Sequence, residues 1–497
     1  MILTKGENVL TTKKNQLKCL FVSSEVVPFA KTGGLADVAG ALPAELITLG
    51  VDVRVVMPYY RTVKNKLPED QLQHVAGYDT SLGWRHQYAD ILYKPTDVPT
   101  YFIKNDRYFD RDGLYGYGDD CERFAFFSKA VAEMICRIGF VPDIVHCNDW
   151  QTGPISLLIK DKYFWDKKYN NIKCVFTIHN IKYQGIFGRE VLEFLELDDG
   201  YANSDKLEFN GGYSFMKAGL LYADHINTVS PTYMEELKTA QYGYGLDSLL
   251  RDQLYWKSSG IINGIDTQRY DPKTDPALYY NFDLKTLDLK EKNKKAFKKE
   301  FGLKEDNSML VSIISRLTDQ KGFDIMKQTI FGQWVMDKIM ELGVQFVLLG
   351  TGEQEYENMF RHFKYLYPDR SVIFLDFNES LAQKIYAASD VFLMPSYFEP
   401  CGLGQLMAMR YGAVPIVRQT GGLKDTVIHY NQTTKEGTGF EFVDYAGYWL
   451  YKKIEEANEL YHNRPSDFRQ IQLNAMKESF GWEESAKKYI KMYEMLM

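Results

Sequence analysis

Residues 17–57 read LKCLFVSSEVVPFAKTGGLADVAGALPAELITLGVDVRVVM and decide the fold of the first half of the chain. The apolar run at 17–24 is typical of a buried parallel strand. A glycine-containing loop follows, and then a helical pattern at 35–49 that ends at Gly50. Residues 51–57 are apolar again. This order of strand, loop, helix and strand is a βαβ unit, which predicts a parallel sheet with helices on both faces.

The alternation of predicted strands and helices continues along the first half of the chain and begins again in the second half. A helix is expected at 380–388, with Asn378 as its N-terminal cap. Two doubly wound sheets in tandem predict a bilobal α/β protein of two Rossmann-like domains, with a deep cleft between the carboxyl edges of the sheets. Further strands are expected at 143–147, 174–178, 225–229, 309–315, 345–350, 372–376, 391–395 and 413–418.

The chain is accordingly divided into four parts. We expect a flexible leader at 1–16, an N-terminal Rossmann-like domain at 17–266 and a C-terminal Rossmann-like domain at 267–479. The polar, Lys-rich stretch at 267–307 is interpreted as surface and linker rather than core. Residues 480–497 show the amphipathic pattern of a docking helix, which does not indicate the domain onto which it docks.

The composition limits the kinds of partner. Among 497 residues, 59 are Lys or Arg and 66 are Asp or Glu, and this net charge of −7 argues against nucleic acid or an anionic membrane as partner. No window approaches the roughly 18 consecutive apolar residues of a membrane-spanning helix. The six cysteines show neither a Cys-x-x-Cys pair nor zinc-like spacing with His. We therefore expect no metal site, and buried thiols in a reducing compartment such as the cytoplasm.

Two loops carry residue types suited to binding phosphate. The KTGGL loop at 31–35 joins a predicted strand to a predicted helix, where paired glycines let the backbone approach an anion. The alternative is a tight turn with a solvated Lys31, and the loop matches neither the dinucleotide fingerprint nor the Walker A pattern. Arg316 and Lys321 follow another strand. The planar guanidinium group of Arg316, beside the ammonium group of Lys321, suits the binding of a diphosphate. The alternative there is a solvated basic turn.

Other strand ends carry candidate chemical groups. Glu399 lies after the strand at 391–395 and before a proline. There its carboxylate can accept hydrogen bonds from sugar hydroxyls, or its negative charge can stabilise a cationic transition state. As an acid at a helix start it would be only structural. Asp149 and His179 follow two strands of the first half, where ligand residues of parallel sheets lie, although a lone His is more often structural. A second TGGL loop, at 420–423, repeats the sequence of the loop at 32–35.

As a set, the motifs resemble one family. KTGGLADV, HCNDW, TIHN, INGID, SRLTDQKG, PSYFEPCGLGQL and TGGLKDTV occur in this order. Together they resemble the ADP-glucose-using glycogen and starch synthases, which are retaining glucosyltransferases of the GT-B fold. The resemblance runs from about residue 18 to the C-terminal helix. Two positions depart from it: Tyr397 stands where the family commonly has Arg, and Gly404 where a bulkier residue is common.

The resemblance implies a role for each matching residue. Arg316 and Lys321 would hold the diphosphate, Tyr386 would stack on adenine, and the second glycine loop would donate backbone N–H groups to sugar and phosphate oxygens. The implied catalytic residues are Asp149, His179, Arg316, Lys321 and Glu399. The implied ADP-glucose-binding residues are Lys31, Gly33, Gly34, Asp37, Asn263, Arg316, Gln320, Lys321, Tyr386, Glu399, Cys401, Gly402, Thr420, Gly421 and Gly422.

The implied reaction transfers glucose, with retention, from ADP-glucose to the non-reducing end of an α-1,4-glucan or malto-oligosaccharide and releases ADP. UDP-glucose stays open as a donor. No cofactor or metal is expected, because two cations can neutralise the leaving group. The sequence of residues 405–417, QLMAMRYGAVPIV, resembles starch synthases more than typical bacterial glycogen synthases and so favours a starch-like product over glycogen. A granule-bound or plastid-stromal location therefore stays open beside the cytoplasm.

Two other classes of function fit the motifs less well. A glucan phosphorylase of related fold would need a buried Lys in the C-terminal domain to anchor pyridoxal phosphate, and no such Lys is identifiable from the sequence. A non-catalytic glucan-binding scaffold would be expected to have lost Glu399, Arg316 or Lys321, and all three are present.

Overall fold

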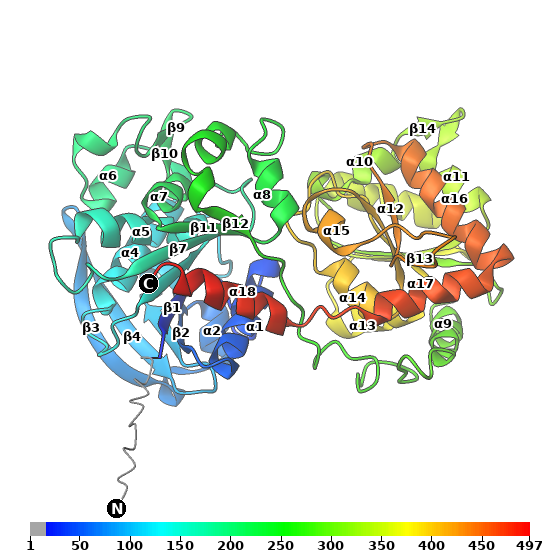
Figure 1. Cartoon of the computed structure of the whole chain (residues 1–497), viewed down its shortest axis with the longest axis horizontal. Coiled ribbons are helices and arrows are strands. Elements are labelled where there is room, and N and C mark those ends of the chain that lie inside the picture. Colours follow the sequence, from blue (N-terminus) through cyan, green and yellow to red (C-terminus); the bar gives the residue numbers. More distant parts are fainter. Residues whose placement is uncertain (1–15) are drawn as a thin grey trace, which may run out of the picture.

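The computed structural model describes residues 16–497, which form two lobes (Figure 1). The N-lobe is built on a nine-stranded sheet. In spatial order its strands are β12 (Ser258–Gly260), β11 (His225–Thr228), β7 (Lys173–Ile178), β6 (Ile144–Asn148), β1 (Lys18–Val22), β2 (Asp52–Pro58), β5 (Thr100–Lys104), β4 (Arg85–Lys94) and β3 (Gln73–Leu82). Strands β12 to β5 are parallel, whereas β4 pairs antiparallel with β3 and β5. The predicted leader lies outside the described residues, except for Gln16.

Helices and a small second sheet surround the N-lobe sheet. In chain order the helices are α1 (Gly34–Thr48), α2 (Arg61–Lys66), α3 (Asp106–Phe109), α4 (Asp120–Met134), α5 (Gly153–Leu157), α6 (Glu190–Leu195), α7 (Phe215–Tyr222) and α8 (Pro231–Leu237). The small sheet contains β8 (Ile186–Phe187), β10 (Gly212–Ser214) and β9 (Glu208–Phe209). The opening βαβ unit is confirmed, because β1 and β2 are parallel neighbours joined through α1. The chain leaves this helix at Gly50, whose φ of 96° suits glycine.

The C-lobe is built on a second sheet, whose six strands are all parallel. In spatial order they are β17 (Ser371–Phe374), β16 (Gln345–Leu349), β13 (Leu310–Ile314), β18 (Val391–Met394), β19 (Val414–Arg418) and β20 (Phe440–Phe442). A short hairpin pairs β14 (Thr329–Ile330) with β15 (Gln333–Trp334). The five predicted strands of this half thus exist, and their observed order places β13 and β18 side by side at the middle of the sheet.

Nine helices of the described chain belong to the C-lobe. They are α9 (Leu289–Glu300), α10 (Phe323–Met326), α11 (Val335–Glu341), α12 (Gln354–Leu366), α13 (Glu379–Ala388), α14 (Gly404–Arg410), α15 (Gly421–Thr426), α16 (Gly447–Asn463) and α17 (Pro465–Lys477). The predicted cap of α13 is confirmed, because the side chain of Asn378 accepts a 2.9 Å hydrogen bond from the N–H of Leu381.

The stretch 267–307 is not only the surface linker that its composition predicts. It contains α9, and Lys290, Lys294 and Lys298 on one face of this helix are buried. Their spacing of four residues places the three side chains on one side. Each ammonium group finds oxygen partners inside the C-lobe. The prediction was wrong because composition registers only charge, whereas the burial of a charged group depends on the partners it finds.

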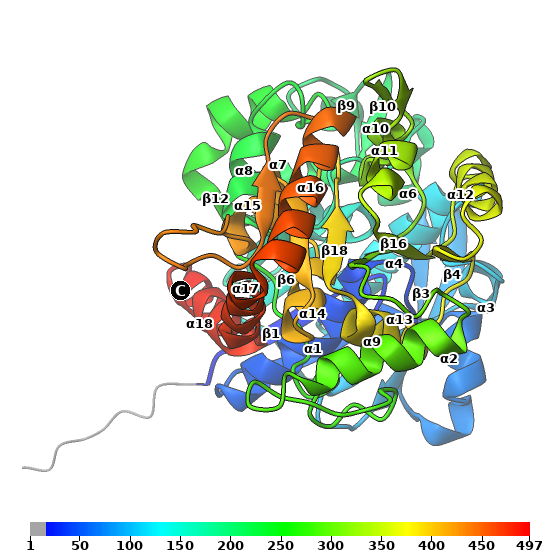
Figure 2. The same ribbon diagram turned by 90° about the vertical axis from the view of Figure 1, so that its right-hand side faces the viewer.

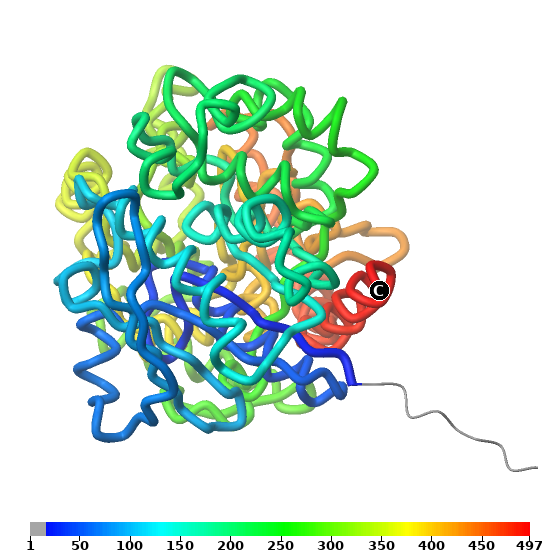
Figure 3. Tube along the Cα trace, turned by 90° about the vertical axis from the view of Figure 1, so that its left-hand side faces the viewer, coloured from blue at the N-terminus to red at the C-terminus, as the bar shows by residue number. Residues whose placement is uncertain are grey.

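The C-terminal helix α18 (Trp482–Glu494) docks on the N-lobe, which answers the question that the sequence left open. It packs against α1, and Figures 2 and 3 show it beside the start of the described chain. The hydroxyl of Tyr493 lies 2.6 Å from Nδ1 of His146. The hydroxyl of Tyr489 accepts a 2.9 Å hydrogen bond from Asn227. Because the partners on the N-lobe are buried strand residues, these polar contacts fix where α18 lies on the sheet.

From residue 16 onwards, no helix is long and apolar enough to cross a membrane. Over the same residues, no group of three or more His, Cys, Asp or Glu side chains is arranged to hold a metal ion. All six cysteines are free thiols. Burial raises the pKa of Cys147 to about 12, so this thiol stays protonated at neutral pH and acts as a packing residue.

His146 should make the fold sensitive to acid. Burial lowers the pKa of His146 to about 3, whereas an unfolded chain keeps it near 6.5. Between these values the unfolded state binds a proton that the folded state does not, so the free energy of unfolding falls as the pH falls. Between about pH 7 and about pH 5.5, His146 should lower that free energy by about 1 kcal/mol. Urea unfolding at both pH values should show this loss.

His146→Gln should show a smaller loss over the same interval, because the new side chain does not titrate. His179, which is also buried, is present in both proteins and does not affect the comparison. An equal loss in the wild-type protein and the variant would contradict the role given to His146.

Candidate active site

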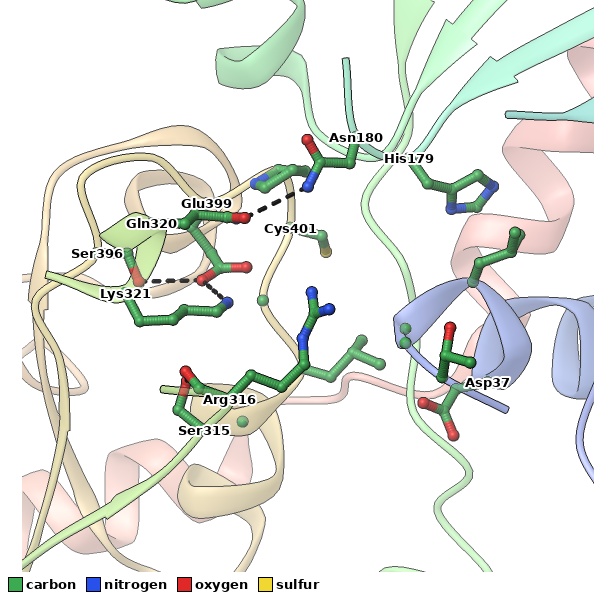
Figure 4. A pocket seen from close by; sticks show the side chains of 18 of the residues that line it. Asp37, His179, Asn180, Ser315, Arg316, Gln320, Lys321, Ser396, Glu399 and Cys401 are labelled. Atoms are coloured by element: carbon green, nitrogen blue, oxygen red, sulfur yellow. Dashed lines mark hydrogen bonds and ion pairs between the residues drawn. The ribbon is translucent and has the colours of Figure 1, made fainter. Parts of the chain in front are cut away.

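A cavity of about 760 Å³ lies between the two lobes, and both lobes line it. Figure 4 shows its two walls, with Glu399, Lys321 and Arg316 on the C-lobe and His179 and Asp37 on the N-lobe. All these residues follow the carboxyl ends of parallel strands or stand at the start of the next helix. A cavity of this volume accepts a ligand of the size of a nucleotide-sugar.

An ion pair joins two loops of the C-lobe wall. Nζ of Lys321, in the loop after β13, lies 2.6 Å from Oε2 of Glu399, in the loop after β18. The hydroxyl of Ser396 donates to the same carboxylate oxygen at 3.0 Å. The loops approach closely at Gly322, where a Cβ would lie 2.0 Å from the carbonyl oxygen of Pro395. A glycine at this position is therefore required for Lys321 to reach Glu399.

Arg316 also belongs to the C-lobe wall and lies at the carboxyl end of β13. Its guanidinium group extends from this wall towards the N-lobe (Figure 4). The structure therefore brings Arg316, Lys321 and Glu399 to one wall, as the sequence predicts. Two cations and one carboxylate leave this wall with a net positive charge, which favours a ligand that carries phosphate.

On the N-lobe wall, Glu25 holds the first glycine loop. Its carboxylate accepts hydrogen bonds from the hydroxyl of Thr32 at 2.6 Å, from the N–H of Gly33 at 3.1 Å and from the N–H of Thr32. The hydroxyl of Tyr115 donates to it at 2.9 Å. Sequence reasoning missed Glu25, although its place after β1 was a usable signal. The loop lines the cavity as predicted, but the N–H of Gly33 is already occupied by a carboxylate.

Lys31 and Asp37 complete this part of the wall. Nζ of Lys31 lies 2.7 Å from Oδ1 of Asp37, and both side chains are partly exposed. Burial raises the pKa of the Asp37 carboxyl, and the charge of Lys31 opposes this shift. Such an exposed pair is weak, so Lys31 can exchange its partner for a phosphate oxygen at little cost.

Asp149 orients the two residues that follow β7. Its Oδ1 accepts hydrogen bonds from the N–H of His179 at 2.7 Å and from the N–H of Asn180 at 3.3 Å. The backbone φ of Asp149 is 57°. A non-glycine residue in this left-handed region is uncommon and occurs often at functional sites. Burial raises the pKa of Asp149 to about 7, and the two N–H donors oppose the shift. Protonation of Asp149 near neutral pH therefore weakens the contacts that hold His179.

His179 is neutral in this site. Burial lowers its pKa to about 3. Its Nε2 lies 2.9 Å from the amide oxygen of Asn148. Because that oxygen is an acceptor, Nε2 carries the proton and Nδ1 offers a lone pair. The lone pair on Nδ1 of such a neutral imidazole can accept a hydrogen bond from a sugar hydroxyl.

The second glycine loop lies elsewhere than the sequence predicts. The hydroxyl of Thr420 and the N–H of Gly421 both donate to Oε1 of Glu236 on α8, at 2.9 and 3.0 Å. The N–H of Gly422 donates to the carbonyl oxygen of Glu399 at 3.2 Å. Within the described chain, none of these three residues lines the cavity. The loop therefore supports Glu399 from behind and joins the lobes, because its backbone donors already have protein partners.

The remaining predicted residues line the cavity: Gly34, Asn263, Gln320, Tyr386, Cys401 and Gly402. Tyr386 is buried and packs on Phe392, with 5.3 Å between ring centroids. Burial raises the pKa of the Cys401 thiol to about 12, so it stays protonated.

The side-chain oxygens of Asn263 and Gln151 are buried without a hydrogen-bond partner in the described part of the chain. Gln151 lines the cavity and was missed by sequence reasoning; unpaired acceptors of this kind suit ligand hydroxyls.

Neither departure from the family pattern disturbs these contacts. The ring of Tyr397 packs against Tyr242 and Tyr445, with centroids 5.9 and 5.0 Å away. At Gly404 a Cβ would lie 3.1 Å from the ring of Phe392, so a larger residue would require a small shift there. Glu399 keeps its contacts to Lys321 and Ser396 beside both.

Comparisons with known proteins agree with this geometry. Residues 18–252 match the family described as starch synthase catalytic domain, and residues 309–442 match glycosyl transferases group 1. The chain is 46% identical to the glycogen synthase of Bacillus cereus, over 97% of this chain and 100% of that protein. It is 48% identical to the glycogen synthase of Clostridium acetobutylicum, over 96% and 99% of the two chains.

Two solved structures are similar. The catalytic domain of starch synthase IV from Arabidopsis thaliana, bound to ADP and acarbose, matches with a TM-score of 0.88 and 33% identity, over 97% of this chain and 99% of that chain. Sucrose-phosphate synthase from Thermosynechococcus elongatus matches with a TM-score of 0.60 and 18% identity, which shows a shared fold. The fold and the site thus define a glycosyltransferase of the GT-B class. Within that class, the chain belongs to the glycogen and starch synthase family, whose members transfer glucosyl units to a glucan.

Asp149 should set the acid limb of the pH profile. Above about pH 7 its carboxylate holds the N–H groups of His179 and Asn180, and below that pH it is protonated. We expect kcat/KM to fall about tenfold per pH unit on the acid side, as for one essential ionisation. Asp149→Asn should be less active and should lack this limb. The exposed Asp199 provides a control, and Asp199→Asn should keep the limb. A limb that persists in Asp149→Asn would contradict the assignment.

Proposed function

We propose that this enzyme transfers glucose from ADP-glucose to the 4-hydroxyl at the non-reducing end of an α-1,4-glucan, with retention of configuration. The observation that carries the proposal is the cavity between the lobes, where Arg316 and the Lys321–Glu399 pair face His179 and Asp149. The ADP and acarbose named for the starch synthase IV structure support a nucleotide donor and a glucan acceptor for this chain as well.

We propose glycogen as the polymer. The two relatives at 46% and 48% identity are named glycogen synthases, whereas the starch synthase neighbour is 33% identical. The starch-like product that residues 405–417 favour, and the granule-bound location that stays open with it, are predictions without support from these relatives.

The chemistry follows from the charges of the walls. Arg316 and Lys321 bind the diphosphate and neutralise the charge that develops as the bond from the anomeric carbon to the phosphate oxygen breaks. The carboxylate of Glu399 accepts hydrogen bonds from sugar hydroxyls or stabilises positive charge on the sugar. The acceptor 4-hydroxyl attacks from the face that the diphosphate leaves, and its proton passes to the leaving phosphate oxygen. The new glycosidic bond then keeps the configuration of the donor.

The described lysines do not favour a phosphorylase that uses pyridoxal phosphate. Lys290, Lys294 and Lys298 are buried in the C-lobe, yet none of them lines the cavity. Lys321 does line it, but its ammonium group pairs with Glu399. A buried amine that anchors a cofactor must instead be free to form a covalent bond inside the site.

Glu399 should be essential for turnover. Glu399→Gln keeps the size of the side chain but removes the charge that faces the sugar and Lys321, and should lower kcat at least about 10²-fold. ADP release from ADP-glucose in the presence of glycogen measures this. Glu355, an exposed carboxylate of the same lobe, provides a matched control, and Glu355→Gln should keep wild-type turnover. Near-normal activity of Glu399→Gln would overturn its assignment.

The donor and the need for metal can be measured together. We expect ADP-glucose to give a higher kcat/KM than UDP-glucose, and excess EDTA to leave the rate with ADP-glucose unchanged, because Arg316 and Lys321 supply the cations. A preference for UDP-glucose would overturn the proposed donor. Loss of activity with EDTA that Mg²⁺ restores would overturn the metal-independent mechanism.

A further inference from the structure

The second glycine loop lies directly behind the loop that carries Glu399. The N–H of Gly422 donates to the carbonyl oxygen of Glu399 at 3.2 Å. A Cβ at Gly421 would lie 1.9 Å from the same carbonyl oxygen, and a Cβ at Gly422 would lie 2.2 Å from the carbonyl oxygen of Cys401. Because the two segments pack this closely, a shift of the turn at 420–422 would move the backbone of Glu399 or break its hydrogen bond.

The partner of this turn is Glu236, on α8 of the N-lobe. Its Oε1 accepts hydrogen bonds from the hydroxyl of Thr420 at 2.9 Å and from the N–H of Gly421 at 3.0 Å. No described residue donates a hydrogen bond to its Oε2, which is buried. A buried carboxylate oxygen without a partner costs free energy, which points to a role for Glu236 beyond the stability of the interface.

A second carboxylate of the same interface acts in the opposite direction. Asp425, on α15, accepts hydrogen bonds at the start of α8, from the hydroxyl of Ser230 at 2.6 Å and from the hydroxyl and the N–H of Thr232 at 2.6 and 3.0 Å. The two helices face each other across the lobes (Figure 1), and each supplies a carboxylate to the start of the other. Asp425 thus joins the lobes without binding the turn behind Glu399.

The same part of the N-lobe also contacts the loop that carries the catalytic carboxylate. The ring centroids of Tyr242 and Tyr397 lie 5.9 Å apart, and those of Tyr244 and Phe398 lie 5.8 Å apart. Both N-lobe rings belong to the segment that follows α8. One N-lobe segment, 236–244, therefore contacts this loop and the turn that supports it.

Contacts within the C-lobe hold Glu399 in part. Lys321 and Ser396 both bind Oε2 of its carboxylate, and Gln320 binds the backbone of the two residues before it. Ser396 belongs to the same loop and moves with it. The long side chain of Lys321 is flexible and can follow a displaced carboxylate, so the backbone of Glu399 depends on the support behind it.

We propose that Glu236 is a positioning residue for Glu399: from the N-lobe it holds the turn at 420–422, and this turn fixes the backbone of Glu399 on the opposite wall of the cavity. The proposal rests on the proposed function, in which Glu399 acts on the sugar. Loss of Glu236 leaves a hydroxyl and a backbone N–H without their partner and frees the turn. Turnover should then fall more than donor binding, because the cations that bind the diphosphate stand on the segment after β13.

The first test compares kcat, and KM for ADP-glucose, among variants of α8. Glu236→Ala should lower kcat about tenfold, the scale of a lost hydrogen bond to a charged group, and should change KM less than about threefold. Glu236→Gln keeps an acceptor oxygen and should restore most of kcat. The neighbouring Glu235 is exposed and pairs with Lys238, so Glu235→Ala should keep the wild-type kcat. A wild-type kcat in Glu236→Ala, or a Glu236→Gln as slow as Glu236→Ala, would overturn the proposal.

Asp425→Ala separates positioning from the joining of the lobes. This variant removes hydrogen bonds from the same interface but leaves those of Glu236 to the turn. It should lower the thermal unfolding temperature about as much as Glu236→Ala does, yet keep kcat within about twofold of the wild-type value. An equal loss of kcat in the two variants would show that Glu236 acts by joining the lobes alone and would overturn the proposal.

A double-mutant cycle tests whether Glu236 acts through Glu399. When residue 399 has lost its charge, its exact position matters less to the reaction. Glu236→Ala should therefore lower the residual kcat of Glu399→Gln no more than about twofold, against about tenfold in the wild-type background. Equal factors in the two backgrounds would contradict the coupling.

Amide hydrogen exchange needs no substrate and so distinguishes this proposal from the proposed function. Glu236→Ala should speed exchange at 401–403 and 421–423, whereas Asp425→Ala should not. Unchanged exchange in Glu236→Ala would overturn the role of Glu236. Faster exchange there, in a protein whose wild type does not use ADP-glucose, would overturn the proposed donor instead.

A smaller change keeps the test decisive if Glu236→Ala does not fold. Thr420→Val removes one of the two donors to Glu236 and keeps the shape of the side chain. It should lower kcat about threefold relative to Glu235→Ala, because one neutral hydrogen bond is lost. An unchanged kcat in Thr420→Val would then overturn the proposal.

Discussion

A parallel sheet presents the carboxyl ends of all its strands at one edge, and the two lobes of this chain turn those edges towards each other. Every functional group on the cavity depends on this constraint. Segments after β1, β5, β6, β7, β11 and β12 supply the N-lobe wall. Segments after β13 and β18, together with Tyr386 on α13, supply the C-lobe wall. Because β13 and β18 are neighbours at the middle of the sheet, Lys321 and Glu399 meet although 78 residues separate them. The ion pair is thus a consequence of strand order.

The charged residues of the two walls of the cavity differ in their balance of sign. The charged residues of the N-lobe wall are Glu25, Lys31, Asp37, Asp120 and Asp149, and those of the C-lobe wall are Arg316, Lys321 and Glu399. A diphosphate is repelled by the first set and attracted by the second. Sugar hydroxyls, by contrast, donate well to carboxylates and to unpaired amide oxygens such as that of Gln151. Under the proposed function, charge thus favours the phosphates near Arg316 and Lys321, whereas the carboxylates of both walls and the amide oxygen of Gln151 suit sugar hydroxyls.

The sequence predicted what depends on order along the chain and missed what depends on three-dimensional partners. The βαβ pattern and the residues at strand ends follow from periodicity, so the two sheets and most cavity residues were predictable. The buried Lys290 and Lys294 of α9 were not, because their oxygen partners lie far along the chain: the carbonyls of Tyr386, Ala387 and Tyr411 for Lys290, and Asp390 and Tyr461 for Lys294. Glu236 and the second glycine loop meet across the lobes, and a repeated motif gave no sign that its donors were already occupied.

The contacts between the two lobes are of several kinds. The chain passes between them twice, and the passages lie side by side: the N–H of Ile265 donates to the carbonyl oxygen of Phe480 at 2.8 Å, and Gly264 has no room for a Cβ beside Trp482. This double crossing is tightly packed. The contacts elsewhere between the lobes, such as Lys182 with Asp319 at 3.1 Å, include partly exposed polar pairs, each of which contributes about 0–1 kcal/mol. Other contacts between the lobes are more buried, such as those of Thr420 and Gly421 with Glu236 on α8. A rotation about the crossing would keep its packed contacts but would have to break these buried hydrogen bonds as well as the exposed pairs.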